Sequence, residues 1–383
     1  MRHLRGAARF SLRFPIDTPL TTVNSEGIDM AISNRSNRSN RSNRSGKTPD
    51  DTAAAVGEAA LSAAIATTYD GVVASQSLDQ EEINHSRPRL QTAIDDEDLA
   101  SLLALDPEWR QVVLLGLVLE GLSVGRTEAG AAVRFRSRGE EKELIEFVPP
   151  DAGYFRGQLA VVRGYADLRA ERLIEINVQL TEIIPFFGAV DRLSPARCPC
   201  TLELLYLAEA LSTIVAQRVK HLLGCPRPID LSSQIQPVIP TPTHSTLPSG
   251  HATEAFITAA ILGKLIDREG ERTAACQRYR IAARIAVNRT IAGVHFPVDS
   301  AAGAVLGVAL AEWLAAAAGD GKCLARRFAP PEGDGVKFDF HYETFRKDVP
   351  EEHWGKRAPG GQALPDEVPL LGALWRRARG EWE

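Results

Sequence analysis

Three short motifs between residues 220 and 299 contain the residue types that bind and activate a tetrahedral oxyanion. They are Lys220-His-Leu-Leu-Gly-Cys-Pro-Arg227-Pro228, then Pro248-Ser249-Gly250-His251, and then the stretch from Arg289 through His295 to Asp299. Together they supply three cations, a hydroxyl group, a glycine amide and two imidazoles. Guanidinium groups bind such an anion as a fixed fork, and lysine binds it as a point charge. Because three clustered cations destabilise a protein unless an anion lies among them, the motifs predict an anion site.

The second motif lies where the sequence predicts the start of a helix over residues 249–266. The first amides of a helix have no partner within it, and the helix dipole favours an anion there. The Ser249 hydroxyl adds a donor, and the missing side chain at Gly250 lets a ligand approach the backbone closely. Small polar residues also start ordinary helices, so this motif alone is not specific.

The two imidazoles could supply nucleophilic and acid–base chemistry. Asp299 follows His295 by four residues, a spacing at which the carboxylate can reach one ring nitrogen or Arg289. The other nitrogen of His295 then stays free to bind a metal or to attack phosphorus. His251 is suited to general acid–base catalysis. A single His–Asp pair at a helix end is usually a local contact, and it is the ordered combination of all three motifs that predicts an active site.

The combined pattern Lys-x6-Arg-Pro, Pro-Ser-Gly-His and Arg-x5-His-x3-Asp resembles one superfamily. That superfamily joins the type-2 phosphatidic acid phosphatases, the bacterial acid phosphatases and the vanadium-dependent haloperoxidases. The sequence departs from the phosphatase pattern at Asn288, where serine is usual, and at Leu247, where tyrosine often stands. The resemblance implies a mainly α fold, a helical bundle of the vanadium haloperoxidase and acid phosphatase type.

The resemblance also implies a role for each residue of the motifs. In a haloperoxidase His295 coordinates the vanadium, while His251 hydrogen-bonds the apical oxygen and moves protons. In a phosphatase His295 instead attacks phosphorus and His251 protonates the leaving group, and in either case Asp299 orients His295 or braces Arg289. The vanadate oxygens would be held by Lys220, Arg227, Ser249, Gly250 and Arg289. Phosphate can occupy the same site, because trigonal-bipyramidal vanadate resembles the transition state of phosphoryl transfer.

The loop before the second motif, with His244 its most informative residue, favours vanadium over phosphate, as does the expected soluble character without a signal peptide. His244 lies five residues before Ser249, where chloroperoxidases tend to have phenylalanine and algal bromoperoxidases histidine. The sequence therefore predicts a vanadium-dependent haloperoxidase, and more narrowly a bromoperoxidase. Such an enzyme would take hydrogen peroxide, a halide and a small organic acceptor, with Lys220 polarising the bound peroxide. The alternatives are a soluble acid phosphatase with His295 as nucleophile, an inactive anion-binding protein, and, for His244 itself, an ordinary surface position.

Helix ends must position these motifs, and the apolar periodicity predicts a bundle. We expect helices over 95–105, 107–122, 157–184, 202–223, 249–266, 272–290, 297–318 and 366–381. Residues 131–135 and 144–148 predict a small β-hairpin, and Gly303 and Gly307 should let a neighbouring helix pack closely. A single helical domain is expected over 51–383, beginning with a helix over 50–66. Its catalytic core lies at about 150–320 and its wrapping segment, rich in proline, glycine and charge, at 324–383. Residues 1–50 read as a disordered tail because of their Ser-Asn-Arg repeat.

Composition and charge limit which kinds of partner and which cellular compartment we expect for this protein. The net charge of −5 argues against nucleic acid as a partner. Residues 301–318 are the nearest approach to a membrane span, but Glu312 interrupts them, so we expect a buried core helix and no span. No signal peptide is seen, which predicts a soluble and, by default, cytoplasmic protein. Five cysteines without regular spacing predict mostly free thiols, and apolar helices in 50–125 suggest a homo-oligomer.

Overall fold

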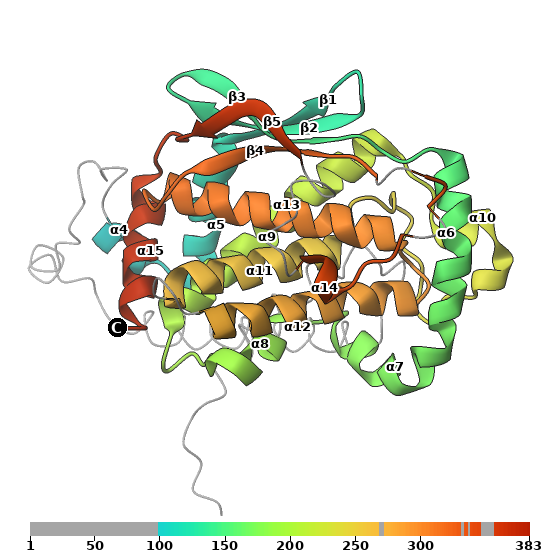
Figure 1. Cartoon of the computed structure of the whole chain (residues 1–383). Coiled ribbons are helices and arrows are strands. Elements are labelled where there is room, and N and C mark those ends of the chain that lie inside the picture. The colour runs from blue at the N-terminus through green and yellow to red at the C-terminus, as the bar shows by residue number, and fades with distance from the viewer. Residues whose placement is uncertain (1–98, 268–271, 331–332, 336–337, 346–355) are drawn as a thin grey trace, which may run out of the picture.

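Helix α13, Pro297–Ala317, is the central helix of the fold, and every one of its residues except Glu312 is buried. The computed structural model describes residues 99–267, 272–330, 333–335, 338–345 and 356–383. Small residues dominate α13, so neighbouring elements can approach it from several sides. It packs against α11 (Gly250–Ile266), α9 (Pro199–Leu223), α12 (Arg272–Ile291) and one face of a small sheet (Figure 1). The buried helix that the sequence predicts here is confirmed.

The remaining helices surround this core. At one end of the bundle lie α4 (Leu99–Ala104), α5 (Pro107–Glu120) and α15 (Pro369–Gly380). At the other end lie α6 (Ala152–Gly164), the 3-10 turn η2 (Tyr165–Leu168), α7 (Arg169–Val178), α10 (Pro228–Leu231) and η3 (Ser233–Ile235). Helix α8 (Ile184–Asp191) lies beside α11 and α12, and the short α14 (Tyr342–Phe345) contacts α12.

The sheet covers the side of α13 that faces away from α12 (Figure 1). It contains β1 (Leu122–Arg126), β2 (Ala131–Ser137), β3 (Glu140–Phe147), β4 (Cys323–Phe328) and β5 (Lys356–Ala363), in that spatial order. All neighbours are antiparallel except β3 and β4, which run parallel. The expected hairpin is confirmed as β2 and β3, in which Val133 lies opposite Ile145.

Two glycines of α13 explain how closely α11 approaches it. A β-carbon added at Gly303 would lie 2.4 Å from the carbonyl oxygen of Ser249, and one at Gly307 would lie 2.5 Å from that of Thr253. No side chain fits at such distances, so these positions require glycine. The amide of Ser249 also donates to the carbonyl of Asp299 at 2.9 Å. The close contact that the sequence predicts is therefore present, and it joins the second motif to the third.

Two predictions about the elements are wrong. The single helix expected over 157–184 is divided into α6, η2 and α7, with a turn at Gln179 before α8. Its apolar residues do not form one buried face: α6 buries Phe155 and Val162, whereas α7 buries Ile176 alone and leaves Leu173, Ile174 and Val178 exposed. Residues 324–364, whose proline, glycine and charge predict a wrapping loop region, instead contain most of β4 and all of β5, which extend the sheet. Strand β4 pairs with β3, about 180 residues earlier in the chain, a non-local partner that the local sequence does not show.

The other expected helices occur with ends shifted by at most a few residues, and the helix expected over 107–122 ends at Glu120 because Leu122 begins β1. The predictions for residues 1–66 lie outside the described residues. Cys198, Cys200, Cys225 and Cys323 are free thiols. By length and composition alone, Pro199–Leu231 and Pro297–Ala317 could cross a membrane, but both are mostly buried, as core helices are, so this is weak evidence for a span.

Candidate anion-binding active site

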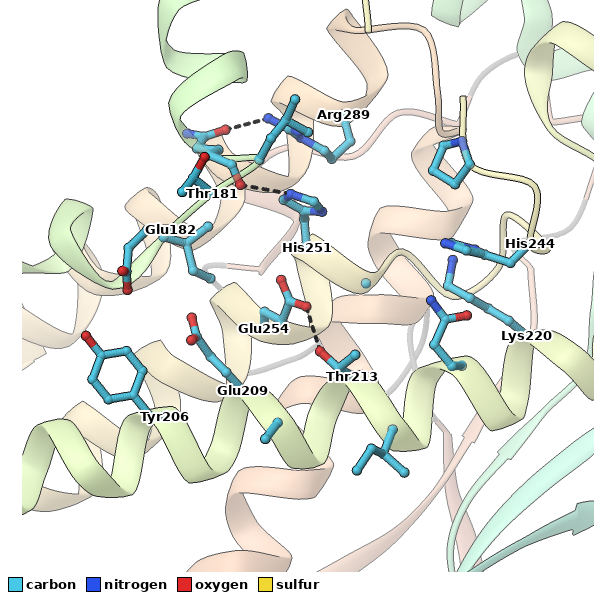
Figure 2. Close-up of a pocket in the computed structure, with 18 of the residues that line it drawn as sticks. Thr181, Glu182, Tyr206, Glu209, Thr213, Lys220, His244, His251, Glu254 and Arg289 are labelled. Atoms are coloured by element: carbon cyan, nitrogen blue, oxygen red, sulfur yellow. Dashed lines mark hydrogen bonds between the residues drawn. The ribbon is translucent and has the colours of Figure 1, made fainter. Parts of the chain in front are cut away.

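The three motifs meet at a cavity of about 350 Å³. Helix α9 supplies Lys220, the end of α12 supplies Arg289, and the start of α11 supplies the glycine and histidine of the second motif (Figure 2). The predicted residues that line the cavity are Lys220, Arg227, His244, Gly250, His251, Arg289 and His295. Ser249 and Asp299 are completely buried directly behind this wall. The structure therefore brings together residues that are separated by up to 79 positions in the sequence.

Lys220 and Arg227 are buried cations held by backbone carbonyls. The ammonium of Lys220 donates to the carbonyls of Ser245 at 2.9 Å and Thr246 at 3.1 Å. Arg227 donates from Nη1 to the carbonyl of Val294 at 2.8 Å. Burial lowers the pKa of Arg227 to about 10, and burial together with the charge of Arg227 holds the pKa of Lys220 well below its usual range. An anion between them would stabilise both charged forms.

Arg289 is the clearest sign of a missing ligand. Its Nη2 donates to Gln179 Oε1 at 2.8 Å and to the carbonyl of Ile176 at 3.1 Å. Its Nε and Nη1 are buried and have no hydrogen-bond partner among the described residues. Burial lowers the pKa of Arg289 to about 10. Two unpartnered donors on a guanidinium that is only 1% exposed, at the wall of a cavity, fit a bound oxyanion.

The proton positions on His295 follow from its neighbours. Arg227 Nη1 lies 3.2 Å from Nε2, and an arginine can only donate, so Nε2 accepts. The proton is then on Nδ1, which lies 3.1 Å from Asp299 Oδ2. Burial lowers the pKa of His295 well below its usual value, with further contributions from Arg227 and Lys220, so the ring is neutral. The lone pair at Nε2, which here accepts from Arg227 at the wall of the cavity, would serve as a nucleophile or a vanadium ligand once Arg227 turned to the anion.

Asp299 is fixed by three donors. Its Oδ2 accepts from Thr246 Oγ1, from the amide of Phe296 at 2.7 Å and from His295. Burial raises the pKa of Asp299 to about 6, although these hydrogen bonds and the nearby cations oppose the rise. Of the two roles expected for Asp299, the structure shows the contact with His295. No contact between Asp299 and Arg289 occurs in the described part of the chain.

His251 is oriented by one hydrogen bond. Its Nε2 lies 3.0 Å from the carbonyl oxygen of Gln179, which can only accept, so Nε2 carries the proton and Nδ1 keeps a lone pair (Figure 2). Burial and the charge of Arg289 lower its pKa to about 3, so the ring is neutral when the cavity holds no anion. An entering anion would favour the protonated ring, which is the change that a general acid needs.

His244 lines the cavity rather than the outer surface. Its Nδ1 lies 3.0 Å from Arg227 Nη2, which can only donate, and 3.2 Å from the carbonyl oxygen of Ser245, which can only accept, so the two contacts favour opposite tautomers. Burial and the charges of Lys220 and Arg227 lower its pKa to about 4. A neutral imidazole therefore lies beside the cations.

The start of α11 completes the binding surface. The hydroxyl oxygen of Ser249 accepts from the amide of Ala252 at 3.4 Å and can still donate its own proton. A β-carbon added at Gly250 would meet no atom within 4 Å, because it would project into the cavity. The helix N-terminus is therefore open to a ligand at the point where glycine was predicted to allow close approach.

Gln179, at the turn after α7, links two functional residues that the sequence did not connect. Its backbone carbonyl holds His251, and its side chain accepts from Arg289 and, at 3.1 Å, from Asn288 Nδ2. Asn288, where the family pattern usually has serine, thus positions Gln179. Four cavity carboxylates, at Glu108, Glu182, Glu209 and Glu254, were also missed. In the sequence they resemble ordinary solvated helix residues, and no local signal distinguishes them.

The donor set fits an oxyanion better than a metal cation. Within the described ranges, no group of three His, Cys, Asp or Glu side chains could hold a metal ion. Vanadate needs one nitrogen ligand, which His295 Nε2 offers, and donors for its oxygens, which Arg289 and the amide of Gly250 offer. The residues present therefore fit vanadate and phosphate alike.

Residues 202–320 match the model of the PAP2 superfamily. This segment is similar to a PAP2 superfamily domain. No curated protein matches the chain significantly. One similar solved structure is the "first transmembrane PAP2 type phosphatidylglycerolphosphate phosphatase from Bacillus subtilis", at 16% identity over 56% of this chain and 80% of that one. Its TM-score of 0.24 is too low to support an inference about this chain. The PAP2 superfamily contains phosphatases and haloperoxidases, so the domain assignment agrees with the predicted superfamily and leaves the activity open.

Proposed function

We propose that this cavity hydrolyses phosphomonoesters. The observation that carries the proposal is the continuation of the cavity beyond the cations, past His251 and along α9 to Tyr206 (Figure 2). A phosphatase must hold an organic leaving group beside its anion site, whereas peroxide and halide require little space. A volume of about 350 Å³ is suited to an organic substrate.

The first step would transfer the phosphoryl group to His295. Nε2 of His295 attacks phosphorus, and the ester P–O bond breaks in line with the new P–N bond. Asp299 stabilises the positive ring through Nδ1–H. Lys220, Arg227 and Arg289, together with the amide of Gly250 and the Ser249 hydroxyl, hold the phosphoryl oxygens. The leaving oxygen takes a proton either from the protonated His251 Nδ1 or from a non-bridging phosphoryl oxygen of a monoanionic substrate.

The second step would return the enzyme to its initial state. Water attacks phosphorus from the side that the leaving group has vacated, and His251 Nδ1 accepts the proton of the water. The P–N bond breaks, and inorganic phosphate leaves. His251 is held for both steps by its bond to the carbonyl of Gln179, which fixes the ring with Nδ1 as the exchangeable position.

The vanadium-dependent haloperoxidase is the second candidate, and His244 favours it. The ring lies in the cavity beside Arg227, where a histidine that tunes halide access would have to be. His295 would ligate vanadate, while Lys220, Arg227, Arg289, Ser249 and Gly250 would hold its oxygens. When bound, vanadate would act as a Lewis acid that activates hydrogen peroxide towards a halide. Four carboxylates in the same cavity oppose halide entry, which is why this candidate is placed second.

Parallel assays on the full-length chain separate the candidates. One assay follows release of phosphate from an aryl phosphate, and the other follows bromination of a dye with orthovanadate, peroxide and bromide. We expect phosphate release that vanadate inhibits and that His295→Ala abolishes. His221→Ala changes an exposed histidine at the end of α9 and should leave the rate unchanged. Bromination without phosphate release would overturn the proposal in favour of the haloperoxidase, and phosphate binding with neither reaction would indicate an inactive anion-binding protein.

A further inference from the structure

Carboxylates line the part of the cavity that extends towards the start of α9 (Figure 2). Glu209 comes from α9, Glu254 from α11 one turn after His251, and Glu182 from the connection between α7 and α8. Glu209 precedes Lys220 by eleven residues, which places them about 16 Å apart along the helix axis. One cavity therefore has cations at one end and carboxylates at the other.

Two of these carboxylates, Glu182 and Glu209, have no hydrogen-bond or ion-pair partner among the described residues that would account for their place in the cavity. Glu254 accepts from Thr213 Oγ1 at 3.0 Å, and the charges of Lys220 and Arg289 act on it, so it serves partly as their counter-charge. The side chains of Glu182 and Glu209 make no hydrogen bond or ion pair within the described ranges. Burial raises the pKa of Glu182 to about 6. Burial, with the negative charges of Glu254 and Glu182, raises the pKa of Glu209 well above its usual range.

This arrangement is unfavourable without a cation. Carboxylates that share a partly apolar cavity repel one another, and burial raises the pKa of Glu182 and of Glu209, which favours their protonated forms relative to exposed carboxylates. Leu115, Ile183 and Ile214 also line the cavity, so apolar atoms replace part of the water around these groups. The cations at the other end show the same imbalance with opposite sign, because Arg289 keeps two buried donors without partners. A single ligand with a negative and a positive end would satisfy both.

We propose that Glu182, Glu209 and Glu254 bind an ammonium or guanidinium group of the substrate. This inference rests on the proposed function for its phosphate end. It narrows the substrate class to phosphomonoesters whose leaving group carries a cation several bonds from the ester oxygen. The phosphate would lie among Lys220, Arg227 and Arg289, and the alkyl portion would pass Ile214.

Binding of phosphonates tests the inference without turnover, because their P–C bond is not hydrolysed. We compare 6-aminohexylphosphonate with n-hexylphosphonate by isothermal titration calorimetry, and 2-aminoethylphosphonate with n-propylphosphonate. The six-carbon ammonium ligand should bind at least about tenfold more tightly than its alkyl partner, as expected for a charge-assisted contact. The gain should be smaller for the two-carbon pair, whose ammonium reaches Glu254 but not Glu209.

Matched variants locate the effect. Glu209→Gln and Glu182→Gln should each reduce the preference for the ammonium ligand by about threefold to tenfold and leave n-hexylphosphonate affinity unchanged. Glu120→Gln removes an exposed carboxylate of α5 and should change neither affinity. Melting temperatures of all variants establish that they are folded.

The outcomes separate this inference from the proposed function. Equal affinity for both members of each pair, or no binding of either, would overturn the carboxylate subsite even if aryl phosphates are hydrolysed. A preference that Glu209→Gln removes would support the subsite even if no ester is hydrolysed, and the phosphatase proposal would then fail alone. A preference that survives both Glu182→Gln and Glu209→Gln would also overturn the inference.

Discussion

Replacing Arg289 by methionine should abolish anion binding while changing the stability of the empty protein little. The parent guanidinium makes two hydrogen bonds, to Gln179 Oε1 and to the carbonyl of Ile176, and keeps two buried donors unpartnered. An oxyanion would accept from Nε and Nη1. Methionine keeps much of the side-chain volume and removes all four donor contacts at once.

The magnitudes follow from these bonds. Two hydrogen bonds from a charged donor are together worth about 3–6 kcal/mol, so the variant should lose about 10²- to 10⁴-fold in phosphate affinity. In the empty protein, the loss of the two existing bonds costs a similar amount. Removal of an incompletely paired buried charge stabilises the empty protein by several kcal/mol and so offsets this loss. The net change in the free energy of unfolding should therefore stay within about 2 kcal/mol.

Calorimetric titration and thermal unfolding measure the two effects separately. Phosphate at one hundred times its dissociation constant should stabilise the parent by about 2.7 kcal/mol, and the same concentration should stabilise Arg289→Met by at most about 0.4 kcal/mol. Arg218→Met replaces an exposed arginine of α9 and should retain the full phosphate effect. Undiminished phosphate affinity in Arg289→Met would refute the assignment of its free donors to the ligand.

Three further changes probe the same site. Gly250→Ala should raise the inhibition constant of phosphate without lowering the melting temperature, because its methyl group would project into the cavity; an unchanged inhibition constant would contradict this. Gln179→Leu should raise KM about tenfold with a smaller change in kcat. The substitution removes the side-chain oxygen that accepts from Arg289 but keeps the backbone carbonyl that accepts from His251. An unchanged KM would show that Gln179 does not position Arg289. Activity should peak near pH 6: the pKa of His251 in the empty protein is about 3, so the transferred proton arrives with the substrate monoanion, which is lost above about pH 6. Below pH 6, Asp299, whose pKa is about 6, loses the charge that stabilises the positive ring of His295. His295, whose pKa is lowered well below its usual value, stays neutral on the acid side, and an optimum above pH 7 in the pH profile of kcat/KM would contradict this account.

The residues that contact the expected anion could be predicted because their positions follow from local rules. A serine before Gly250 starts α11, a proline at position 297 starts α13, and Gly224, with φ of 62°, ends α9. Because the motifs lie at these helix ends, they come together where the ends of the helices meet in the bundle. The pairing of His295 with Asp299 follows from their spacing alone.

The rest of the site depends on contacts between distant segments. Gln179 becomes important only because α7 ends beside α12, and the periodicity that predicts one long helix gives no sign of that turn. Glu182 and Glu209 are of interest because they line the same cavity. In the sequence they look like ordinary charged residues of predicted helices. Bound vanadate, the homo-oligomer and the absence of a membrane span stay predictions.

Trapping a phosphorylated enzyme tests the central claim most directly. The full-length chain is mixed with an excess of aryl phosphate and quenched within milliseconds under alkaline conditions that preserve phosphohistidine, and the peptide that contains His295 is analysed by mass spectrometry. The account predicts one phosphoryl group on that peptide, located on the ring of His295, and none in His295→Ala. Phosphate release at the parent rate with an unmodified His295, or a phosphoryl group on any other residue, would contradict it.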